Sequence, residues 1–276
     1  MPELPEVETT RRGIAPSLLG KSLAGATVRE SRLRWPVPPD LAALVAGRTV
    51  EAVGRRAKYL LFDLGTGHLI LHLGMSGSLR FLHEAPPAVK HEHVDLLLSD
   101  SALLRYRDPR RFGAILWQPG PAELHPLLRD LGPEPLEAGF DGAYLEQALA
   151  GRRTAIKLAI MDARVVVGVG NIYANEALFR CGIAPQREAG ELSRAECGQL
   201  ADAIRLTLTE SIAAGGSTLR DFVDSSGQPG YFQQHYFVYD RAGLPCHRCG
   251  QAISQTRLGQ RSTYWCPYCQ PQLSRK

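Results

Sequence analysis

The hydrophobic pattern divides the chain into a β-rich part and a helical part. Residues 5–19 place Val7, Ile14 and Leu18 at helical spacing on one face, which predicts a helix. Between residues 21 and 118 the apolar positions fall instead in short runs rich in Val, Leu, Ile and aromatic residues, namely TVEAV, KYLLFDL, HLILHLG, SLRFL, HVDLLLS, ALLRYR and GAILW. Short strands without intervening helices predict a β-sandwich behind an N-terminal helix.

The pattern changes again after residue 119. The segment PGPAELHPLLRDLGPEPLEAG is rich in Pro and Gly, which is typical of a connection between domains. Helical periodicity follows in AYLEQALAG, TAIKLAIMD, NIYANEALFRCG and RAECGQLADAIRLTLTESIAAG. A long loop begins after Gly216, and loops of this length are usually functional or disordered. We expect an α+β multidomain protein with a β-sandwich domain at 1–120, a linker at 121–139, a helical domain at 140–235 and a C-terminal unit at 236–276.

The composition is that of a globular protein, with 44% hydrophobic and 22% charged residues. No stretch approaches the ~20 apolar residues of a membrane span, and the acidic start lacks the features of a secretory signal. We therefore expect a cytoplasmic protein whose mature chain begins at Pro2. Basic residues outnumber acidic ones in 1–120 and 236–276, while the reverse holds in 121–235. This asymmetry favours a polyanionic partner, although a solvated basic surface has the same signature.

The C-terminal tail carries a metal signature. Two residues separate Cys246 from Cys249 and Cys266 from Cys269, which is the spacing of a four-cysteine zinc ribbon. Four thiolates complete a tetrahedral shell, so we predict one structural Zn²⁺ that supplies folding energy to a small unit. Two disulfides are the alternative, which a reducing compartment disfavours.

The residues between the two cysteine pairs predict a β-hairpin. SQTRLGQRSTYW would turn at Leu258–Gly259 and place Arg257 and Arg261 near its tip. Because the planar guanidinium suits phosphate, this hairpin is a candidate probe of a DNA groove. Zinc ribbons also serve structural or protein-binding roles, so the ribbon alone leaves the function open.

The first ten residues, MPELPEVETT, place carboxylates around a proline. After removal of Met1, Pro2 offers a secondary α-amine, and an α-amine with a pKa of about 7.7–8.0 is partly unprotonated at neutral pH. Such an amine is a nucleophile toward carbonyl-like carbons. Glu3 is adjacent, and Glu6 lies where the helix dipole favours an anion. From these ten residues alone, glutamates that only balance the helix dipole are the simpler explanation.

Eight motifs in one order reverse that judgement. MPELPEVETTRRGI, LHLGMSGSL, KHEHVDLLL, YRDPRRFGA, VVVGVGNIYANEALF, GGSTLRDF, GQPGYF and the four-cysteine ribbon resemble bacterial formamidopyrimidine-DNA glycosylase, a family that excises 8-oxoguanine and ring-opened purines. The resemblance covers the chain from Met1 to the last cysteine. It implies a β-sandwich, a helix–two-turn–helix domain and a zinc finger, acting as a monomer on double-stranded DNA with oxidised purines or abasic sites.

The resemblance also implies residue roles. Pro2 would attack C1′ of the damaged nucleotide, Glu3 would transfer a proton at the sugar, and Glu6 would support the site. The resulting iminium leads to β,δ-elimination, so a glycosylase is coupled to an apurinic/apyrimidinic lyase. The implied DNA contacts are the wedges Met75 and Phe112, Arg110 opposite the lesion, and His72, His91, Lys157, Asn171, Lys58 and Arg261, the last two also assisting catalysis.

An enzyme that acts on a base inside a duplex must flip the nucleotide out, and apolar wedges offset part of the cost. Taken alone, Met75 and Phe112 are more simply core residues, but the turn-like contexts GMSG and DPRRFG disfavour burial. Residues 218–231 match a lid over the everted base. Ala163 and Asn175 depart from the commonest family pattern, which puts the local phosphate geometry in question.

Three alternatives remain. An endonuclease VIII-type enzyme for oxidised pyrimidines shares the proline, the glutamate and the zinc, but the ELPEVET start, Met75, DPRRFG and the long lid favour the purine enzyme. A non-catalytic damage binder needs Arg110, Lys58 and the hairpin, but neither a free Pro2 nor Glu3. A zinc-ribbon protein of transcription or translation explains the tail alone.

Overall fold

The computed structural model describes residues 2–216 and 236–272. They form two compact units, one of residues 2–130 with 214–216 and the other of residues 131–213 with 236–272. The finer division at residues 120, 140 and 236 stays a prediction. The whole of the expected lid at 218–231 lies within residues 217–235, which are outside the described residues. Within the described residues, no helix is both long and apolar enough to cross a membrane.

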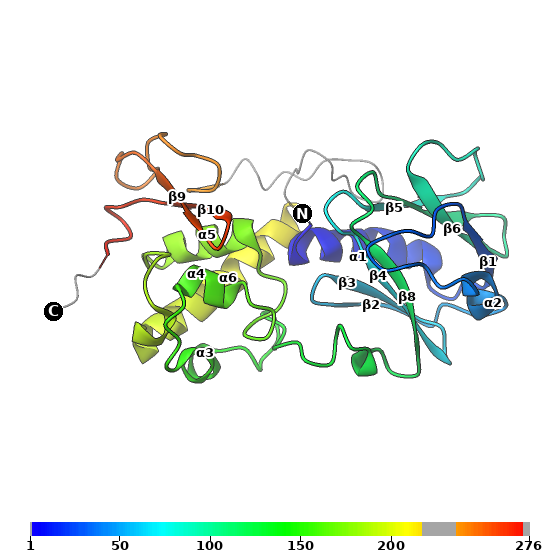
Figure 1. The fold of residues 1–276 in the computed structure, drawn as a ribbon, viewed down its shortest axis with the longest axis horizontal. Coiled ribbons are helices and arrows are strands. Elements are labelled where there is room, and N and C mark those ends of the chain that lie inside the picture. Colours follow the sequence, from blue (N-terminus) through cyan, green and yellow to red (C-terminus); the bar gives the residue numbers. More distant parts are fainter. Residues whose placement is uncertain (1, 217–235, 273–276) are drawn as a thin grey trace. The chain divides into compact units, whose positions relative to one another are not determined.

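The first unit contains two four-stranded antiparallel sheets and helix α1, Leu4–Leu18 (Figure 1). The strand orders are β1-β6-β7-β5 and β2-β3-β4-β8. The strands are β1 Leu23–Val28, β2 Ala52–Arg56, β3 Tyr59–Asp63, β4 Gly67–His72, β5 Ser78–Leu82, β6 Glu92–Leu98, β7 Leu103–Arg107 and β8 Ala114–Pro119, with a short helix α2 at Leu41–Val45 and a 3₁₀ turn η1 at Ala122–Leu124. The predicted β-sandwich behind an N-terminal helix is confirmed.

One hydrophobic core joins α1 to both sheets. Val7, Ile14 and Leu18 are at most 1% exposed, and they belong to the same cluster as Phe62 of β3 and Leu104 of β7. The predicted apolar face of the helix is therefore the buried face. Burial of side chains this size stabilises the unit by about 1.5–3 kcal/mol each.

Two strands depart from the sequence pattern. The predicted runs omit β1, because LAGATV is rich in Gly and Ala and has a weak apolar signal. Pairing with β6, in which Val28 lies opposite Val94, makes this segment a strand. The run TVEAV predicts a strand that starts three residues before β2. The difference arises because β2 ends on two arginines, which a pattern of apolar residues does not include.

The second unit is helical and ends in a hairpin (Figure 1). Its elements are α3 Gly142–Leu149, α4 Ile156–Ile160, α5 Asn171–Arg180, η2 Ala189–Glu191, α6 Arg194–Ala213, β9 Ser254–Leu258 and β10 Arg261–Trp265. The four predicted helical stretches are confirmed. At the start of α3 the Asp141 carboxylate accepts from the Tyr144 N–H at 2.8 Å, an ordinary N-cap.

The hairpin turns one residue later than the sequence predicts. Its two turn residues are Gly259 and Gln260, with φ of +52° and +63°, and Leu258 pairs with Arg261. Two positive φ angles match the twist of the flanking strands, which favours this turn in short hairpins. A Cβ at Gly259 would lie 2.9 Å from Leu158 Cδ2, so the tip of the hairpin rests against α4.

Candidate active site

The N-terminus of α1 brings three predicted site residues together. Glu3 is the N-cap residue, and its backbone N–H donates to Glu6 Oε2 at 2.7 Å. The Glu3 carboxylate accepts in turn from the Glu6 N–H, which completes a reciprocal capping box. The amide held by Glu6 is the one that joins Pro2 to Glu3, so this hydrogen bond orients Pro2. All three residues are buried, with Glu6 0% exposed.

A cluster of charges ties α1 to the sheet. The Glu8 carboxylate accepts from Arg11 Nη2 and Arg12 Nε at 2.8 Å each and from Arg55 Nε of β2 at 3.3 Å. Burial alone would raise the pKa of Glu8. Hydrogen bonds from Arg11 and Arg12 and the charges of Arg11 and Arg55 outweigh burial and lower that pKa to about 2. The carboxylate therefore stays ionised at neutral pH and anchors the helix that carries Pro2.

Lys58 and His72 lie close to one another on the second sheet. Lys58 is in the turn between β2 and β3, and the next residue, Tyr59, pairs with His72. The Gly74 N–H donates to His72 Nδ1 at 3.0 Å, so the imidazole proton lies on Nε2. Burial first, then the charges of Lys58 and Arg34, lowers the pKa of His72 to about 4. His72 is therefore neutral near pH 7 yet keeps an N–H donor suited to a phosphate oxygen.

The predicted wedge residues lie in two turns that share one carboxylate. Met75 is in the turn between β4 and β5, and Phe112 is in the turn between β7 and β8. Asp108, which is 0% exposed, accepts from Ser76 Oγ at 2.8 Å and from the Gly113 N–H at 2.9 Å. Asp108 stands inside the DPRRFG motif, but no local pattern distinguishes it as a functional residue.

Two more donors complete the environment of this carboxylate. The Tyr106 hydroxyl donates to Asp108 Oδ2 at 3.1 Å, and the Arg110 N–H lies 3.3 Å from Oδ1 and 3.2 Å from Ser76 Oγ. Burial first, then the negative charge of Asp108, raises the pKa of Tyr106 well above 10. The phenol thus remains protonated and continues to donate.

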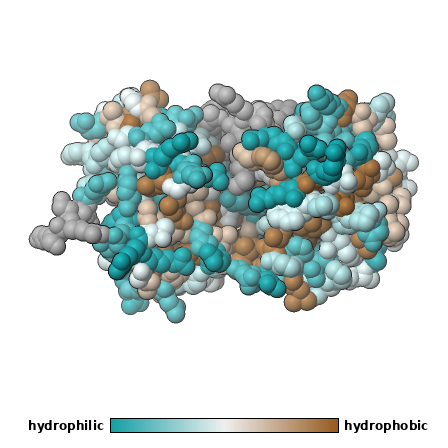
Figure 2. Space-filling view, in the orientation of Figure 1, coloured by the Kyte–Doolittle hydropathy of each residue, from teal (hydrophilic) through white to brown (hydrophobic). Residues whose placement is uncertain are grey.

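Phe112 is 44% exposed, in agreement with its turn context, and the Arg110 guanidinium carbon lies 5.1 Å from the centre of its ring. Met75 is half-buried. The face shown in Figure 2 is mostly hydrophilic with apolar side chains interspersed. His91 is half-buried at a positive φ of +74°, with its ring 6.3 Å from that of His93.

In the second unit, three predicted DNA contacts meet at the hairpin. Asn171 Nδ2 donates to the Ser262 carbonyl oxygen at 3.0 Å, and Lys157 Nζ donates to the same oxygen at 2.9 Å and to Thr263 Oγ1 at 2.7 Å. Arg261, which precedes Ser262, is exposed. Lys157 is 0% exposed, and its amine anchors the hairpin to α4, while its expected contact with DNA stays a prediction.

Asn175 has a clear structural role. Its Oδ1 accepts from the Tyr264 N–H at 2.9 Å, and its Nδ2 donates to the Asn171 carbonyl oxygen, so it ties α5 to β10. This departure from the family pattern supports the hairpin that presents the arginine. Ala163 is exposed, and its carbonyl oxygen accepts from the Gly132 N–H at 2.8 Å.

Glu176 is a second residue that the sequence does not single out. Its carboxylate is 0% exposed and accepts from the N–H groups of Phe237, Val238 and Tyr239 at 2.8–3.0 Å. Burial raises the pKa of Glu176 despite these three bonds. The Glu176 carboxylate holds the segment that leads into the cysteine ribbon. The sequence gives no local sign of this role, because the partners of Glu176 lie some sixty positions away in the chain.

The four ribbon cysteines form a metal site. Their Sγ atoms all lie within 4.8 Å of one another, with Cys249 and Cys266 3.4 Å apart and Cys246 and Cys269 3.9 Å apart. A tetrahedron with zinc–sulfur bonds of about 2.3 Å has edges of about 3.8 Å, so the donor set fits Zn²⁺. None of the six cysteines is in a disulfide, so the zinc site is supported over the disulfide alternative. With four protein ligands the zinc is structural and has no open position for catalysis.

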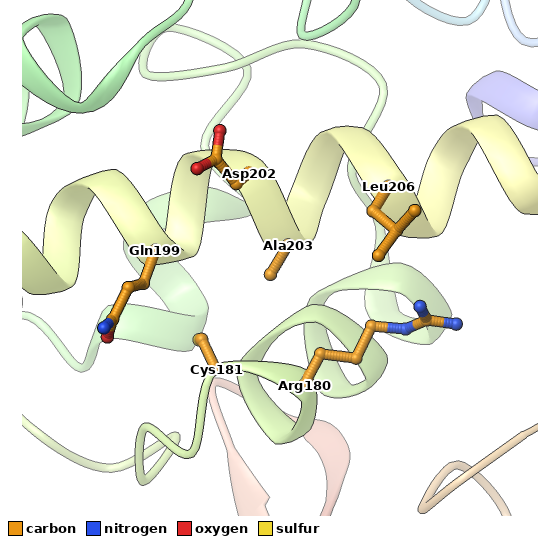
Figure 3. A pocket seen from close by; sticks show the side chains of 6 residues that line it. All are labelled: Arg180, Cys181, Gln199, Asp202, Ala203 and Leu206. Atoms are coloured by element: carbon orange, nitrogen blue, oxygen red, sulfur yellow. The ribbon is translucent and has the colours of Figure 1, made fainter.

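A separate pocket of about 500 Å³ lies between the end of α5 and α6 (Figure 3). It is lined by Arg180, Cys181, Gln199, Asp202, Ala203 and Leu206. Burial raises the pKa of Cys181 to about 12, so this thiol stays protonated and is a poor nucleophile at neutral pH. The pocket contains none of the predicted site residues.

Comparison with known proteins decides the family. Residues 1–115 match the formamidopyrimidine-DNA glycosylase N-terminal domain, residues 131–223 match its H2TH domain, and residues 243–272 match the zinc finger found in FPG and IleRS. The chain belongs to the formamidopyrimidine-DNA glycosylase family. The family resemblance and the four-cysteine zinc finger predicted from the sequence are both confirmed, and the protein binds one structural zinc ion.

Relatives in this glycosylase family cover the whole molecule. The formamidopyrimidine-DNA glycosylases of Laribacter hongkongensis and Methylococcus capsulatus are each 60% identical, over 98% of this chain and 100% of theirs. The crystal structure of MutM (Fpg) from Thermus thermophilus has a TM-score of 0.88 at 39% identity, covering 99% of this chain and 100% of that one. A Lactococcus lactis Fpg variant bound to DNA with Fapy-dG has a TM-score of 0.90 at 32% identity, covering 98% and 100%.

Proposed function

We propose that this chain excises oxidised purines from double-stranded DNA and then cleaves the strand, as a DNA glycosylase and apurinic/apyrimidinic lyase of base excision repair. Full-length relatives at 53–60% identity carry the glycosylase name. Lactococcus lactis Fpg has been solved with DNA that contains Fapy-dG and with DNA that contains an abasic site. These relatives support the purine enzyme over the endonuclease VIII-type alternative, and they support an enzyme over a binder.

The capping box at Pro2 carries the catalytic part of the proposal. Glu6 orients the Pro2–Glu3 amide, and Glu3 lies directly beside the amine. The lone pair of the Pro2 nitrogen bonds to C1′ as the bond from C1′ to the damaged base breaks, and the base leaves with that electron pair and takes a proton from water. The Glu3 carboxylate accepts the proton that the Pro2 amine loses. Glu3 then transfers a proton to the sugar ring oxygen, so the ring opens to an iminium.

Strand cleavage follows from the iminium. The cationic nitrogen draws electrons from C1′ and acidifies the C2′ proton, whose loss expels the 3′ phosphate. A second elimination expels the 5′ phosphate, and water releases the sugar fragment from Pro2. Lys58 and Arg261 assist by binding the two phosphates as they leave, because cations stabilise the developing negative charge.

The DNA contacts divide between the two units. In the first, His72 and Lys58 bind phosphate, Met75 and Phe112 act as wedges, and Arg110 faces the orphaned base. In the second, Asn171 and Arg261 bind phosphate through the start of α5 and the hairpin tip. Lys157 acts by holding Ser262 and Thr263, which fixes the strand that begins with Arg261. His91 is the remaining proposed DNA contact.

We place the enzyme in the cytoplasm, where it acts as a monomer on the DNA of the nucleoid.

Covalent trapping tests this function. Borohydride reduces an imine or iminium, so we expect an irreversible adduct with abasic and 8-oxoguanine DNA whose crosslinked peptide begins at Pro2. A chain with one extra residue before Pro2 keeps every side chain but lacks the amine, and it should form no adduct. Attachment at a lysine, or trapping by the extended chain, would refute the proposal. Stronger excision of thymine glycol than of 8-oxoguanine opposite cytosine would instead favour the endonuclease VIII-type enzyme.

A further inference from the structure

We propose that Asp108 is a positioning residue that couples the Met75 turn to the Arg110–Phe112 turn, so that the wedges and the opposite-base arginine enter DNA as one rigid unit. The inference rests on the proposed function, because it concerns how that function meets a duplex. It adds a residue that touches neither the DNA nor the nucleophile.

The hydrogen bonds reach both turns from one carboxylate. Oδ1 accepts from Ser76, the residue next to Met75, and Oδ2 accepts from Gly113, the residue next to Phe112. The Arg110 N–H is shared between Asp108 Oδ1 and Ser76 Oγ. Each wedge residue is therefore one position away from a group bonded to the same side chain.

Backbone packing makes the coupling rigid. A Cβ at Gly74 would lie 2.4 Å from the Phe112 carbonyl carbon and 2.4 Å from the Gly113 nitrogen. A Cβ at Gly113 would lie 1.8 Å from the Tyr106 hydroxyl oxygen and 2.5 Å from the His72 carbonyl oxygen. Glycine at these positions lets the two turns touch, and neither turn can shift without moving the other.

The sheet fixes the carboxylate itself. The His93 ring nitrogen Nε2 lies 2.8 Å from the Asp108 carbonyl oxygen, and the Tyr106 hydroxyl reaches its Oδ2. Asp108 is fully buried, and four donors occupy its two oxygens. A buried carboxylate satisfied in this way holds its partners strongly, since loss of any one leaves an unpaired polar group.

Unstacking a duplex needs the wedges and the arginine to act at the same step. A wedge that enters without Arg110 leaves the opposite base unpaired, and an arginine without wedges meets a closed stack. Coupled turns meet both requirements in one motion. Uncoupling the two turns should therefore slow excision strongly on an intact duplex and only weakly where the base stack is already open.

The test uses two variants and three substrates. Ser76→Ala removes the link to the Met75 turn and leaves the other bonds of Asp108 in place. Asp108→Asn keeps the shape of the side chain but replaces one accepting oxygen with an NH₂ group, which then faces one of the N–H donors and cannot accept from it. The substrates are a duplex with 8-oxoguanine opposite cytosine, the same lesion opposite an abasic site, and a single-stranded abasic oligonucleotide for borohydride trapping.

We expect both variants to excise 8-oxoguanine opposite cytosine about tenfold more slowly in single turnover, as loss of one charge-assisted hydrogen bond would give. The deficit should shrink when the lesion lies opposite an abasic site. Trapping on the single strand should equal that of the unmodified protein. A 2-aminopurine beside the lesion should show slower stack opening in both variants.

Asp95→Asn is the matched control. Asp95 is 3% exposed in the same sheet, and its carboxylate is bonded to Arg105 at 2.8 Å and paired with Arg29, away from both turns. The substitution should lower the thermal midpoint without changing the ratio of duplex excision to single-strand trapping. Unchanged duplex excision in both variants, or equal losses on the duplex and the single strand, would overturn the proposal. Absence of trapping by the unmodified protein would refute the proposed function instead.

Discussion

Gly74 lies directly against the backbone of Phe112. With φ of +65° and a Cβ position only 2.4 Å from the Phe112 carbonyl carbon, no other residue fits at position 74 without displacing the neighbouring turn. The GMSG and DPRRFG motifs, some thirty residues apart in the chain, are thus one structural element. The contact explains why a glycine precedes the wedge methionine.

Gly74→Ala should be much more damaging than backbone strain alone predicts. Gly47 has a similar φ of +73° but has no atom within 4 Å of its Cβ position, so Gly47→Ala carries the strain without the clash. We expect Gly74→Ala to cost about 1–3 kcal/mol more than Gly47→Ala, the usual range for overpacking. Urea unfolding of both variants measures the difference, and equal losses would show that the two turns are not in contact.

Glu3→Gln should separate binding from chemistry. The amide oxygen of glutamine can still accept from the Glu6 N–H, so the capping box and the fold should survive. Loss of the proton-transfer group should slow base excision by at least about 100-fold while duplex affinity stays near that of the unmodified protein. Single-turnover excision and a binding titration on the same duplex measure the two effects.

Glu8→Gln is the control for this substitution. Glu8 lies on the same helix and is ionised through Arg11, Arg12 and Arg55. Loss of the Glu8 charge should lower the free energy of unfolding, yet the excision rate per folded molecule should stay unchanged. If Glu3→Gln kept normal excision, Glu3 would have no part in the mechanism.

Cys249→Ser should remove the zinc and weaken DNA binding together. The zinc cluster organises the β9–β10 hairpin, in which Arg261 is the first residue of β10. Structural zinc sites supply much of the folding energy of small zinc-binding units. Metal analysis should find one zinc in the unmodified protein and none in the variant. Cys197→Ser, a buried thiol outside the cluster, should keep both metal and affinity. Tight duplex binding by a zinc-free Cys249→Ser protein would contradict the role given to the hairpin.

The neutral imidazole of His72 makes stability depend on pH. Its pKa is about 4 in the folded protein against an ordinary value of 6.5, so between these values only the unfolded chain takes up the proton. The contribution of His72 to stability is therefore complete above pH 6.5 and is lost as the pH falls toward 4. The urea midpoint should fall less for His72→Gln than for the unmodified protein between about pH 7 and about pH 5. An identical fall in both would mean that His72 titrates normally.

Local patterns in the sequence determined a large part of this protein. Helical spacing predicted α1, α3, α4, α5 and α6, and alternating or apolar runs predicted seven of the strands of the sandwich. The paired cysteines predicted the zinc site, because two-residue spacing lets one knuckle provide two ligands. The N-terminal motif brought Pro2, Glu3 and Glu6 into one group, since all three lie in or just before the first turn of one helix.

Tertiary structure decided what depends on contacts between distant parts of the chain. Strand β1 exists because β6 pairs with it, Asp108 joins two turns that each connect one sheet to the other, and Lys157 bonds to the hairpin at Ser262. Periodicity describes which face of an element a residue occupies, not which distant group it meets. Only the folded chain sets those partners, because a hydrogen bond forms between atoms that packing has brought within about 3 Å.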